Sequence, residues 1–258
     1  MNLTPPPGPL TGWTVICLRP SMQQAAARRA VRARGGVHVS LPGLRLVAQQ
    51  AGEALVRALD CAAVVFTSPA AVHFAALQHV LELPSGVRCF AVGEGTARAL
   101  ARHGVRAIAP PPDAMHSEGV LALLQWQGLK GPVGLVTAPG GRGIIAAGLL
   151  RRGFSLRRAE VYRREPPRFD ARHLAALRQI DGPRAVLVSS AEALDAVLAI
   201  LPADVRAGIF DGLVVASSPR LAELAGLRDF RATIIATAPT IQALLDALAR
   251  HVATPGFR

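Results

Sequence analysis

The sequence predicts an α/β fold with two domains, each built around a parallel sheet. Short apolar runs alternate with stretches of helical periodicity along nearly the whole chain, which is typical of parallel α/β sheets. The length of 258 residues is sufficient for two domains of ordinary size. Strand-ending hydroxyls in the first half recur 122 residues later, and this repeat predicts two related units of ~120 residues each.

The predicted strands are short runs bounded by glycine, proline or polar residues. Several are apolar at nearly every position, as in "TVICL" and "AAVVF", which indicates strands that are covered on both faces. They cover residues 14–18, 37–41, 62–66, 88–93, 105–110, 133–138, 155–162, 185–189, 212–217 and 232–237.

The predicted helices lie between these strands, and several have a recognisable start or stop. Ser21 and Ser117 are suitable N-caps, and Gly35 and Gly104 are suitable stop residues. The helices cover residues 21–36, 50–59, 69–79, 95–104, 117–128, 144–153, 170–179, 191–200, 219–226 and 240–251.

The composition is that of a folded, basic protein. Hydrophobic residues make up 51% of the chain and charged residues 18%, which excludes a disordered protein. The net charge of +12 comes from arginines spread along the chain, since Lys130 is the only lysine. Aromatic residues are only 4%, too few for base-stacking surfaces, and no nucleic-acid-binding motif is present. We therefore expect no nucleic acid partner, although a basic nucleic-acid-associated protein stays open as a third interpretation.

The N-terminus and the cysteines favour a cytoplasmic protein. "MNLTPPPGPLTGW" lacks the basic and apolar segments of a signal peptide, so residues 1–12 are expected to be a disordered lead-in. No apolar run reaches the ~18–20 residues that cross a bilayer, and no membrane is expected as a partner. Cys17, Cys61 and Cys89 lie in or beside apolar segments without metal-ligand spacing, which indicates buried thiols in a reducing compartment.

Adjacent hydroxyls end a strand and open a helix at corresponding places in both halves. Thr67 and Ser68 follow "VVF", and Ser189 and Ser190 follow "VLV" 122 residues later. Two further pairs of hydroxyl residues have a similar spacing between the halves: Thr96 with Ser218, and Ser117 with Thr240. Ligands of open α/β sheets bind outside the carboxyl ends of the strands, so these corners can line a cleft. The alternative, favoured for any one corner by itself, is a helix N-cap that contributes about 1 kcal/mol.

A glycine-rich turn and a lone tyrosine are the remaining candidates for chemistry. In "APGGRG", residues 138–143, backbone amides could hold a carboxylate or phosphate and Arg142 could add charge, or the segment could be a tight turn alone. Tyr162, the only tyrosine, could donate a proton or, as spacing alone favours, anchor a strand. No carboxylate pair, Walker A motif or metal-ligand spacing is present.

Six motifs in succession resemble the uroporphyrinogen-III synthase family. "VVFTSPAAVHFA", "FAVGEGTARALARHGV" and "SEGVLALL" are similar to successive elements of that family. "GGRGIIAAGLLRRGFSLRRAEVYRREPP", "AVLVSSAEALDAVL" and "LVVASSPRLAELA" follow in the family's order. The resemblance runs from about Trp13 to the last helix. Its specificity lies in the order of the motifs, because each motif alone is weak.

The resemblance implies a monomer with two α/β domains, flavodoxin-like halves joined by a two-stranded linker, and an active site in the cleft between the domains. The N-terminal strand and helix would pack with the C-terminal half, so domain 1 would be discontinuous. Its expected bounds are residues 13–40 and 164–258, and those of domain 2 are residues 41–163. Periodicity by itself does not indicate this arrangement.

The resemblance also implies the reaction and the partners. Hydroxymethylbilane, a linear tetrapyrrole polycarboxylate, would lose its hydroxyl, react at the substituted carbon of ring D, and close with ring D inverted to uroporphyrinogen III and water. No cofactor or metal is implied, and a transient hand-over of the substrate from hydroxymethylbilane synthase is expected. The enzyme would mainly fold the substrate and select the attacking carbon. A positive field would help to gather a polyanion.

Carried over by position, Tyr162 matches the family tyrosine that is thought to assist departure of the hydroxyl. The positions that match substrate-binding residues of the family are Thr67, Ser68, Gly93, Thr96, Ser117, Gly140, Gly141, Arg142, Ser189, Ser190 and Ser218. Ser218 stands where many members have threonine, and Ser189 where threonine or phenylalanine is frequent. These departures put a role for the two side chains in doubt, but not a role for their backbone N–H groups.

Two classes of function therefore compete. The leading hypothesis is a cyclising hydro-lyase of tetrapyrrole and haem biosynthesis. The alternative is a non-catalytic two-domain protein that closes on an anionic small molecule. Both predict a cleft lined by the same corners, and turnover that depends on Tyr162 distinguishes them.

Overall fold

The computed structural model describes residues 8–111, 114–126, 128–140 and 143–254. Contacts between Cα atoms divide the chain into two compact units: unit 1 comprises Met1–Arg45 and Glu165–Arg258, and unit 2 comprises Leu46–Arg164. Unit 1 is therefore discontinuous in sequence. This division differs by a few residues from the predicted boundaries, because Leu41 is buried among side chains of unit 1.

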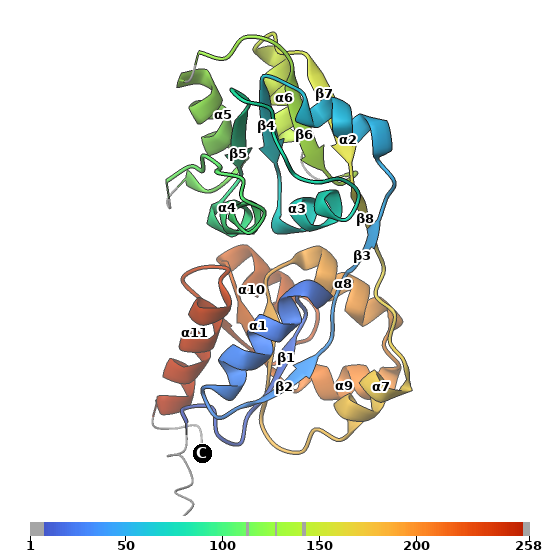
Figure 1. Ribbon diagram of the computed structural model, residues 1–258. Coiled ribbons are helices and arrows are strands. Elements are labelled where there is room, and N and C mark those ends of the chain that lie inside the picture. The colour runs from blue at the N-terminus through green and yellow to red at the C-terminus, as the bar shows by residue number, and fades with distance from the viewer. Residues whose placement is uncertain (1–7, 112–113, 127, 141–142, 255–258) are drawn as a thin grey trace, which may run out of the picture. The chain divides into compact units, whose positions relative to one another are not determined.

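Unit 1 contains a sheet in which all paired strands are parallel. Its strands are β1 (Thr14–Cys17), β2 (Val37–Ser40), β9 (Arg184–Val188), β10 (Leu213–Ala216) and β11 (Ala232–Ile235). Their order across the sheet is β11-β10-β9-β1-β2 (Figure 1). The N-terminal β1 thus pairs with β9 from the C-terminal half, which makes the discontinuous unit one folded body.

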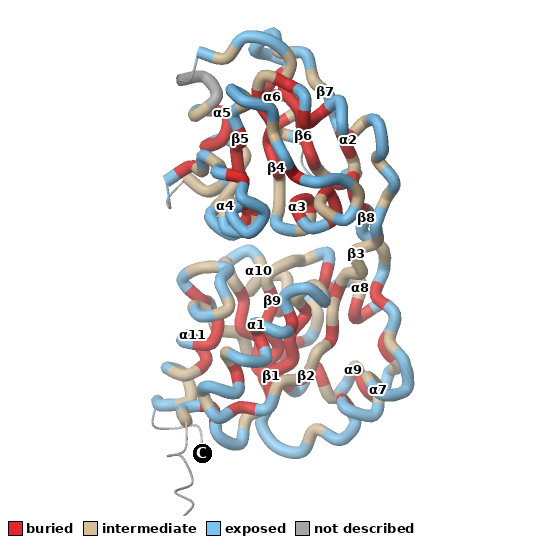
Figure 2. The backbone as a smooth tube through the Cα atoms, viewed as in Figure 1, coloured by how far each residue is buried: buried red, intermediate tan, exposed pale blue. Residues whose placement is uncertain are grey.

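Helices cover both faces of the unit 1 sheet. They are α1 (Ser21–Arg32), α7 (Ala171–Arg178), α8 (Ala191–Ile200), α9 (Ala203–Phe210), α10 (Pro219–Gly226) and α11 (Ile241–Ala253). Successive residues of a strand point to opposite faces. In β9, Val186 and Val188 pack with α8 and α9, whereas Ala185 and Leu187 pack with α1 and α11. This two-sided burial explains the continuous apolar runs of the sequence (Figure 2).

Unit 2 has the same layers around a smaller parallel sheet. Its strands are β4 (Ala63–Phe66), β5 (Arg88–Ala91), β6 (Val133–Thr137) and β7 (Leu156–Glu160), in the order β5-β4-β6-β7. Its helices are α2 (Gly52–Leu59), α3 (Pro69–Ala76), α4 (Glu94–Ala101), α5 (Ser117–Trp126) and α6 (Ile144–Arg151). Val64 and Phe66 of β4 pack toward α2 and α3, and Ala63 and Val65 toward α5 and α6. The predicted fold class is confirmed.

The two sheets repeat one topology. In unit 2, β4 lies between β5 and β6, and β7 lies beyond β6; in unit 1, β9 lies between β10 and β1, and β2 lies beyond β1. The outer pairs share a register: Thr14 pairs with Val37, and Val133 with Leu156, a separation of 23 residues in both. The strand–helix–strand segment β6–α6–β7 comes last in the sequence of unit 2. Its counterpart in unit 1, β1–α1–β2, comes first in the chain.

A separate two-stranded sheet carries both passages of the chain between the units. It consists of β3 (Arg45–Ala48) and β8 (Tyr162–Glu165), and Arg45 forms an ion pair with Glu165. The strand predicted over residues 155–162 is in fact divided between β7 and β8. Val161, which separates them, is fully buried and accepts a hydrogen bond from the Gln49 N–H at 3.0 Å.

The strand predicted over residues 105–110 is wrong. Only one parallel bridge, between Ile108 and Phe90, is formed there. In unit 1 the matching segment is β11, which pairs along its length with β10. Pro110 and Pro111 follow Ile108, and because proline has no N–H to donate, they stop the ladder.

The N-terminal segment also departs from expectation. The part of the predicted disordered lead-in that the structure describes, residues 8–12, is ordered, because Leu10 is fully buried and its N–H donates to the Arg34 carbonyl at 2.8 Å. Ser21 is not the N-cap of α1: it is the first helical residue, and Pro20 occupies the cap position.

Candidate functional site

The carboxyl ends of three neighbouring strands bring polar side chains to one edge of the unit 2 sheet. Thr67 and Ser68 follow β4, Thr137 ends β6, and Tyr162 comes two residues after the end of β7. β6 pairs with β4 on one side and with β7 on the other. Parallel strands end at the same edge, so these side chains meet although 95 residues separate Thr67 from Tyr162.

The Thr-Ser-Pro corner folds as its local sequence favours. Ser68 has an extended backbone, and its hydroxyl oxygen accepts a hydrogen bond from the Ala71 N–H at 3.0 Å, so Ser68 is the N-cap of α3. Pro69 occupies the first turn, where its missing N–H costs no helical hydrogen bond. Capping uses the Ser68 oxygen as an acceptor, and its hydroxyl proton stays available for a second bond.

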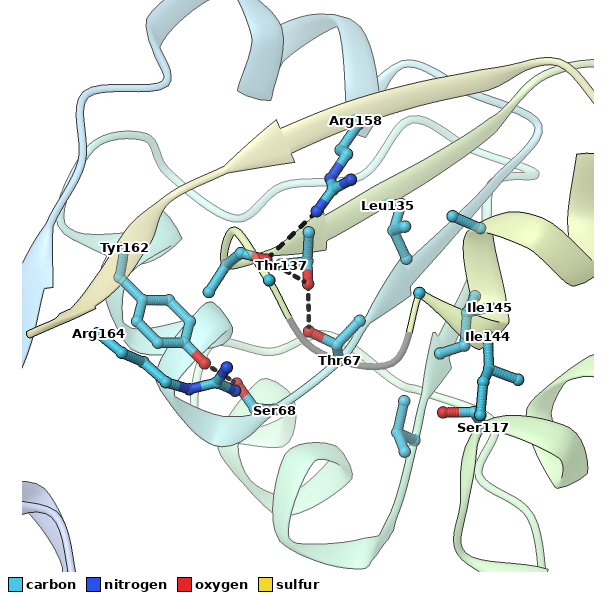
Figure 3. A pocket seen from close by; sticks show the side chains of 15 residues that line it. Thr67, Ser68, Ser117, Leu135, Thr137, Ile144, Ile145, Arg158, Tyr162 and Arg164 are labelled. Atoms are coloured by element: carbon cyan, nitrogen blue, oxygen red, sulfur yellow. Dashed lines mark hydrogen bonds between the residues drawn. The ribbon is translucent and has the colours of Figure 1, made fainter. Parts of the chain in front are cut away.

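That second bond joins Ser68 to Tyr162. Their hydroxyl oxygens lie 3.1 Å apart, and either can donate. The Tyr162 ring stacks on Phe74 of α3, with centroids 5.4 Å apart and an interplanar angle of 18°. Tyr162 is only 3% exposed. Packing therefore holds the ring, and Figure 3 shows its hydroxyl directed at Ser68.

Gln78, just after α3, anchors the backbone next to Tyr162. Its side-chain nitrogen donates to the carbonyls of Gln49 at 3.0 Å and Val161 at 3.2 Å. Its side-chain oxygen accepts from the Ala51 N–H at 2.8 Å. The Gln78 side-chain amide thus joins three segments of the chain. Because it holds Val161, it fixes the backbone directly before Tyr162.

A second polar cluster lies beside the first. The Thr67 hydroxyl donates to the Thr137 hydroxyl oxygen at 3.0 Å. Arg158 of β7 forms an ion pair with Glu160 at 2.8 Å and donates to the Ala138 carbonyl at 3.4 Å (Figure 3). Arg158 therefore ties the start of the glycine-rich turn to the neighbouring strand.

Both clusters line a pocket of about 200 Å³ within unit 2 (Figure 3). Its polar lining is Thr67, Ser68, Ser117, Thr137, Arg158, Tyr162 and Arg164. Its apolar lining includes Val92, Leu135, Ile144 and Ile145. Among the described residues that line it there is no aspartate or glutamate. Hydroxyls and guanidinium groups against an apolar wall suit a ligand that is partly apolar and carries negative charge.

Five of the residues predicted from the sequence meet in this pocket. They are Thr67, Ser68, Ser117, Gly140 and Tyr162. Gly140 has a φ of +76°, a backbone conformation that favours glycine, at the turn after β6. The predicted Gly141 and Arg142 fall outside the described residues.

Gly93, Thr96 and Ser117 belong to helix starts. Gly93 is the N-cap of α4 and accepts a hydrogen bond from the Thr96 N–H at 3.0 Å, and Thr96 is buried in the first turn. Neither residue lines the pocket described above. Ser117 does line it, but it is the first residue of α5 and not the cap that the pattern predicts.

Three predicted residues lie at the corresponding edge of the unit 1 sheet. Ser189 directly follows β9, and Ser190 is the N-cap of α8, accepting from the Ala193 N–H at 3.2 Å. Ser218 is the N-cap of α10 and accepts from the Leu221 N–H at 3.4 Å. For Ser190 and Ser218, capping is the role that the structure establishes.

Sequence reasoning missed Thr137, Arg158 and Arg164. The sequence contained a signal for Thr137, because it is a hydroxyl residue at the carboxyl end of an apolar strand, as Thr67 is. A signal also existed for Arg164, because residues two apart in a strand share a face and Arg164 comes two after Tyr162. Nothing in the sequence distinguishes Arg158 from the many other arginines, since its place depends on strand pairing.

The three cysteines are not among the described residues that line the pocket. Cys17, Cys61 and Cys89 are free and buried, and burial raises the pKa of each thiol, to about 12 for Cys89. Thiols that stay protonated at neutral pH are poor nucleophiles.

Within the described ranges, no group of three or more His, Cys, Asp or Glu side chains could hold a metal ion. None of the described helices is long and apolar enough to cross a membrane.

Comparison with known proteins identifies the family. The chain matches the family model described as uroporphyrinogen-III synthase HemD over residues 25–246. Uroporphyrinogen-III synthetase from Helicobacter pylori is similar with a TM-score of 0.64 and 17% identity, covering 93% of this chain and 99% of that one. A mutant uroporphyrinogen III synthase from the extremely thermophilic bacterium Thermus thermophilus is similar with a TM-score of 0.54 and 19% identity, covering 92% and 97%. At these identities the solved structures show the fold, while the family model spans most of the sequence. The chain therefore belongs to the uroporphyrinogen-III synthase HemD family.

Proposed function

We propose that this chain converts hydroxymethylbilane into uroporphyrinogen III and that the pocket around Ser68 and Tyr162 is part of its active site. Family membership confirms the predicted enzyme class, a cyclising lyase of tetrapyrrole biosynthesis, and supports it over a binding protein without turnover. The observation that supports the site is the 3.1 Å contact between two hydroxyls that line one pocket.

The first step of this reaction needs a proton donor at the substrate's hydroxyl. Ser68 accepts from a backbone N–H and can donate its own proton to the Tyr162 oxygen. The phenol proton is then free to point into the pocket, where Tyr162 donates it to the departing hydroxyl. The C–O bond breaks with its electrons on oxygen, water leaves, and the pyrrole nitrogen lone pair completes the azafulvene cation. A positioned proton donor contributes roughly 10²–10⁴-fold to a rate.

The later steps rearrange carbon–carbon bonds. The π electrons of ring D form a bond from its substituted carbon to the cationic carbon, giving the spiro intermediate. The older bond at that carbon then breaks, and the second cation closes on the free carbon of ring D. That carbon loses its proton, which restores the phenol, so the net change is the loss of one water. For these steps the enzyme must mainly orient ring D and prevent direct closure to the type I isomer. Further acid or base groups are less important.

The remaining proposed contacts are with the substrate's carboxylates. Thr67, Ser117 and Gly140 line the same pocket as Tyr162 and present hydroxyl or backbone groups there. The family resemblance supports the rest of the proposed set, which is Gly93, Thr96, Gly141, Arg142, Ser189, Ser190 and Ser218. For the capping serines among them, the backbone N–H groups are the proposed donors, because the side-chain oxygens already accept a bond.

We also propose that the enzyme is a cytoplasmic monomer that receives its substrate by transient hand-over from hydroxymethylbilane synthase. Three free, buried cysteines support a reducing compartment. The tendency of hydroxymethylbilane to close spontaneously to the type I isomer supports a short path between the two enzymes. Light scattering on a size-exclusion column checks the monomer, for which a mass near 27.0 kDa is expected.

A coupled assay tests the function. Hydroxymethylbilane is generated in situ with and without this protein, and the products are oxidised and separated by chromatography. We expect mainly isomer III in the presence of the protein and isomer I in its absence. If only isomer I forms while the protein is folded and in excess, the synthase function is refuted and the non-catalytic binding protein becomes the better hypothesis.

A further inference from the structure

We propose that Arg164 binds a carboxylate side chain of the substrate and thereby holds the tetrapyrrole in the pocket that contains Tyr162. This inference rests on the proposed function and deepens it, since it assigns a ligand group to a residue that sequence analysis did not select.

The placement of Arg164 follows from strand geometry. Arg164 and Tyr162 both belong to β8 and are two residues apart, so they lie on the same face of the strand. Both line the pocket together with Ser68, and Figure 3 shows both side chains extending toward Ser68. Arg163 points to the opposite face and does not line this pocket.

The guanidinium of Arg164 is available for a ligand. Arg158, the other arginine among the described lining residues, is paired with Glu160. Within the described part of the chain, Arg164 has neither a hydrogen-bond nor an ion-pair partner. Among the described residues, therefore, no carboxylate neutralises its charge, and the described lining of the pocket contains none.

The chemistry of this arrangement favours a carboxylate. A guanidinium is charged at every physiological pH and presents a planar fork of donors that matches a carboxylate in two parallel hydrogen bonds. The pocket of about 200 Å³ is below the ~300–1,000 Å³ typical of sites for whole small molecules. It is suited to one pyrrole ring with its acidic side chains rather than to the entire tetrapyrrole.

Kinetics of matched variants test this role. Arg164→Gln should raise the KM for hydroxymethylbilane about tenfold, because charged hydrogen bonds contribute roughly that factor or more, while kcat stays within about twofold. Arg164→Lys keeps the charge without the fork and should restore part of the loss. Arg163→Gln, which changes the same charge on the opposite face of β8, should leave KM within about twofold of the wild type.

Binding of uroporphyrin III, the oxidised product, gives a readout that does not depend on turnover. Arg164→Gln should weaken it about tenfold at low salt, and the difference from the wild type should shrink at high ionic strength. Equal KM and equal uroporphyrin affinity in Arg164→Gln and the wild type would overturn the inference, and so would equal effects of Arg163→Gln and Arg164→Gln. A wild-type protein that yields only isomer I refutes the proposed function instead, and the uroporphyrin titration then still decides the role of Arg164.

Discussion

Ser68 in unit 2 and Ser190 in unit 1 occupy equivalent corners with different surroundings. Each follows the strand at the same place in its sheet, β4 or β9, and each hydroxyl caps the next helix, at 3.0 Å and 3.2 Å. Ser68 makes a further bond to Tyr162. Within the described residues, the Ser190 hydroxyl makes the cap bond alone. The same local structure therefore carries a paired hydroxyl in one unit and an unpaired one in the other.

The difference lies in the segment that leaves the last strand of each sheet. Tyr162 comes six residues after Leu156, the first paired residue of β7; Gly43 comes six residues after Val37, the first paired residue of β2. Gly43 is thus the topological counterpart of Tyr162. A Cβ on Gly43 would lie 2.5 Å from the Ala193 Cβ, so the chain of unit 1 packs directly on the start of α8. Where unit 2 places a phenol, unit 1 has no room even for a methyl group.

The two units therefore share their architecture but not the side chains at this corner. Both units hold a capped helix at the end of an inner strand, because that corner stabilises any α/β sheet by about 1 kcal/mol. In unit 2 the neighbouring segment contributes a tyrosine, which gives the Ser68 hydroxyl a second hydrogen-bond partner.

The largest effect is expected at the residue that distinguishes the units. Tyr162→Phe keeps the ring that stacks on Phe74 but removes the phenol O–H. We expect kcat for isomer III to fall roughly 10²–10⁴-fold, the range of a lost proton donor, with little change in thermal unfolding. Stopped-flow or coupled turnover with isomer analysis measures this. A rate within twofold of the wild type, in a folded variant, would remove Tyr162 from the chemistry.

The next effect is a difference in how the buried thiols of the two units change the stability of the protein at alkaline pH. Burial alone raises the pKa of Cys89 in β5 to about 12, whereas at Cys17 in β1 the nearby Arg19 opposes the effect of burial. A thiol whose folded pKa lies above its unfolded pKa contributes stability that is present below about pH 9 and is lost as pH rises toward about 12, because the unfolded chain releases its proton first.

Unfolding by denaturant as a function of pH measures this loss. The stability of the wild type relative to Cys89→Ala should decrease by about 2.5 kcal/mol between pH 8 and pH 11. The same comparison with Cys17→Ala should show a smaller decrease, because the backbone N–H of Arg19 and then its charge favour the thiolate in the folded protein. Parallel curves for the two variants would show that their surroundings do not differ in this way.

The smallest effect concerns the caps themselves. Ser68→Ala and Ser190→Ala should each cost about 1 kcal/mol of unfolding free energy, because each removes one cap. Ser68→Ala should also reduce isomer III formation about tenfold, since Tyr162 loses the partner that orients its proton, and Ser190→Ala should reduce it less. Denaturant unfolding and initial rates measure the two quantities.

A matched control comes from a cap that lies outside the proposed site. Thr240 caps α11 by accepting from the Ala243 N–H at 3.2 Å. Thr240→Ala should lose the same stability as Ser68→Ala and retain full activity. If Ser68→Ala and Thr240→Ala lower activity equally, the loss reports stability, and the Ser68–Tyr162 bond has no role in turnover.

Much of the site was predictable because its parts are local. A hydroxyl before proline at the end of an apolar run predicts an N-cap, and Ser68 and Ser218 are both N-caps. Thr67, Ser68 and Tyr162 were all selected from the sequence, and all three line the pocket. Gln78 and Arg164 were not selected, because their importance depends on which segments lie beside them.

The α/β layers, most strand and helix positions and the repeat could be predicted from sequence patterns, and the ordered motifs indicated the family. These follow from patterns of burial and capping that act over a few residues. Only the folded structure shows that β9 is the C-terminal strand beside β1, that Tyr162 reaches Ser68 while Gly43 packs on Ala193, and that Arg164 shares the pocket. Those contacts join residues that are far apart in the chain, and only the pairing and packing of whole strands brings them within bonding distance.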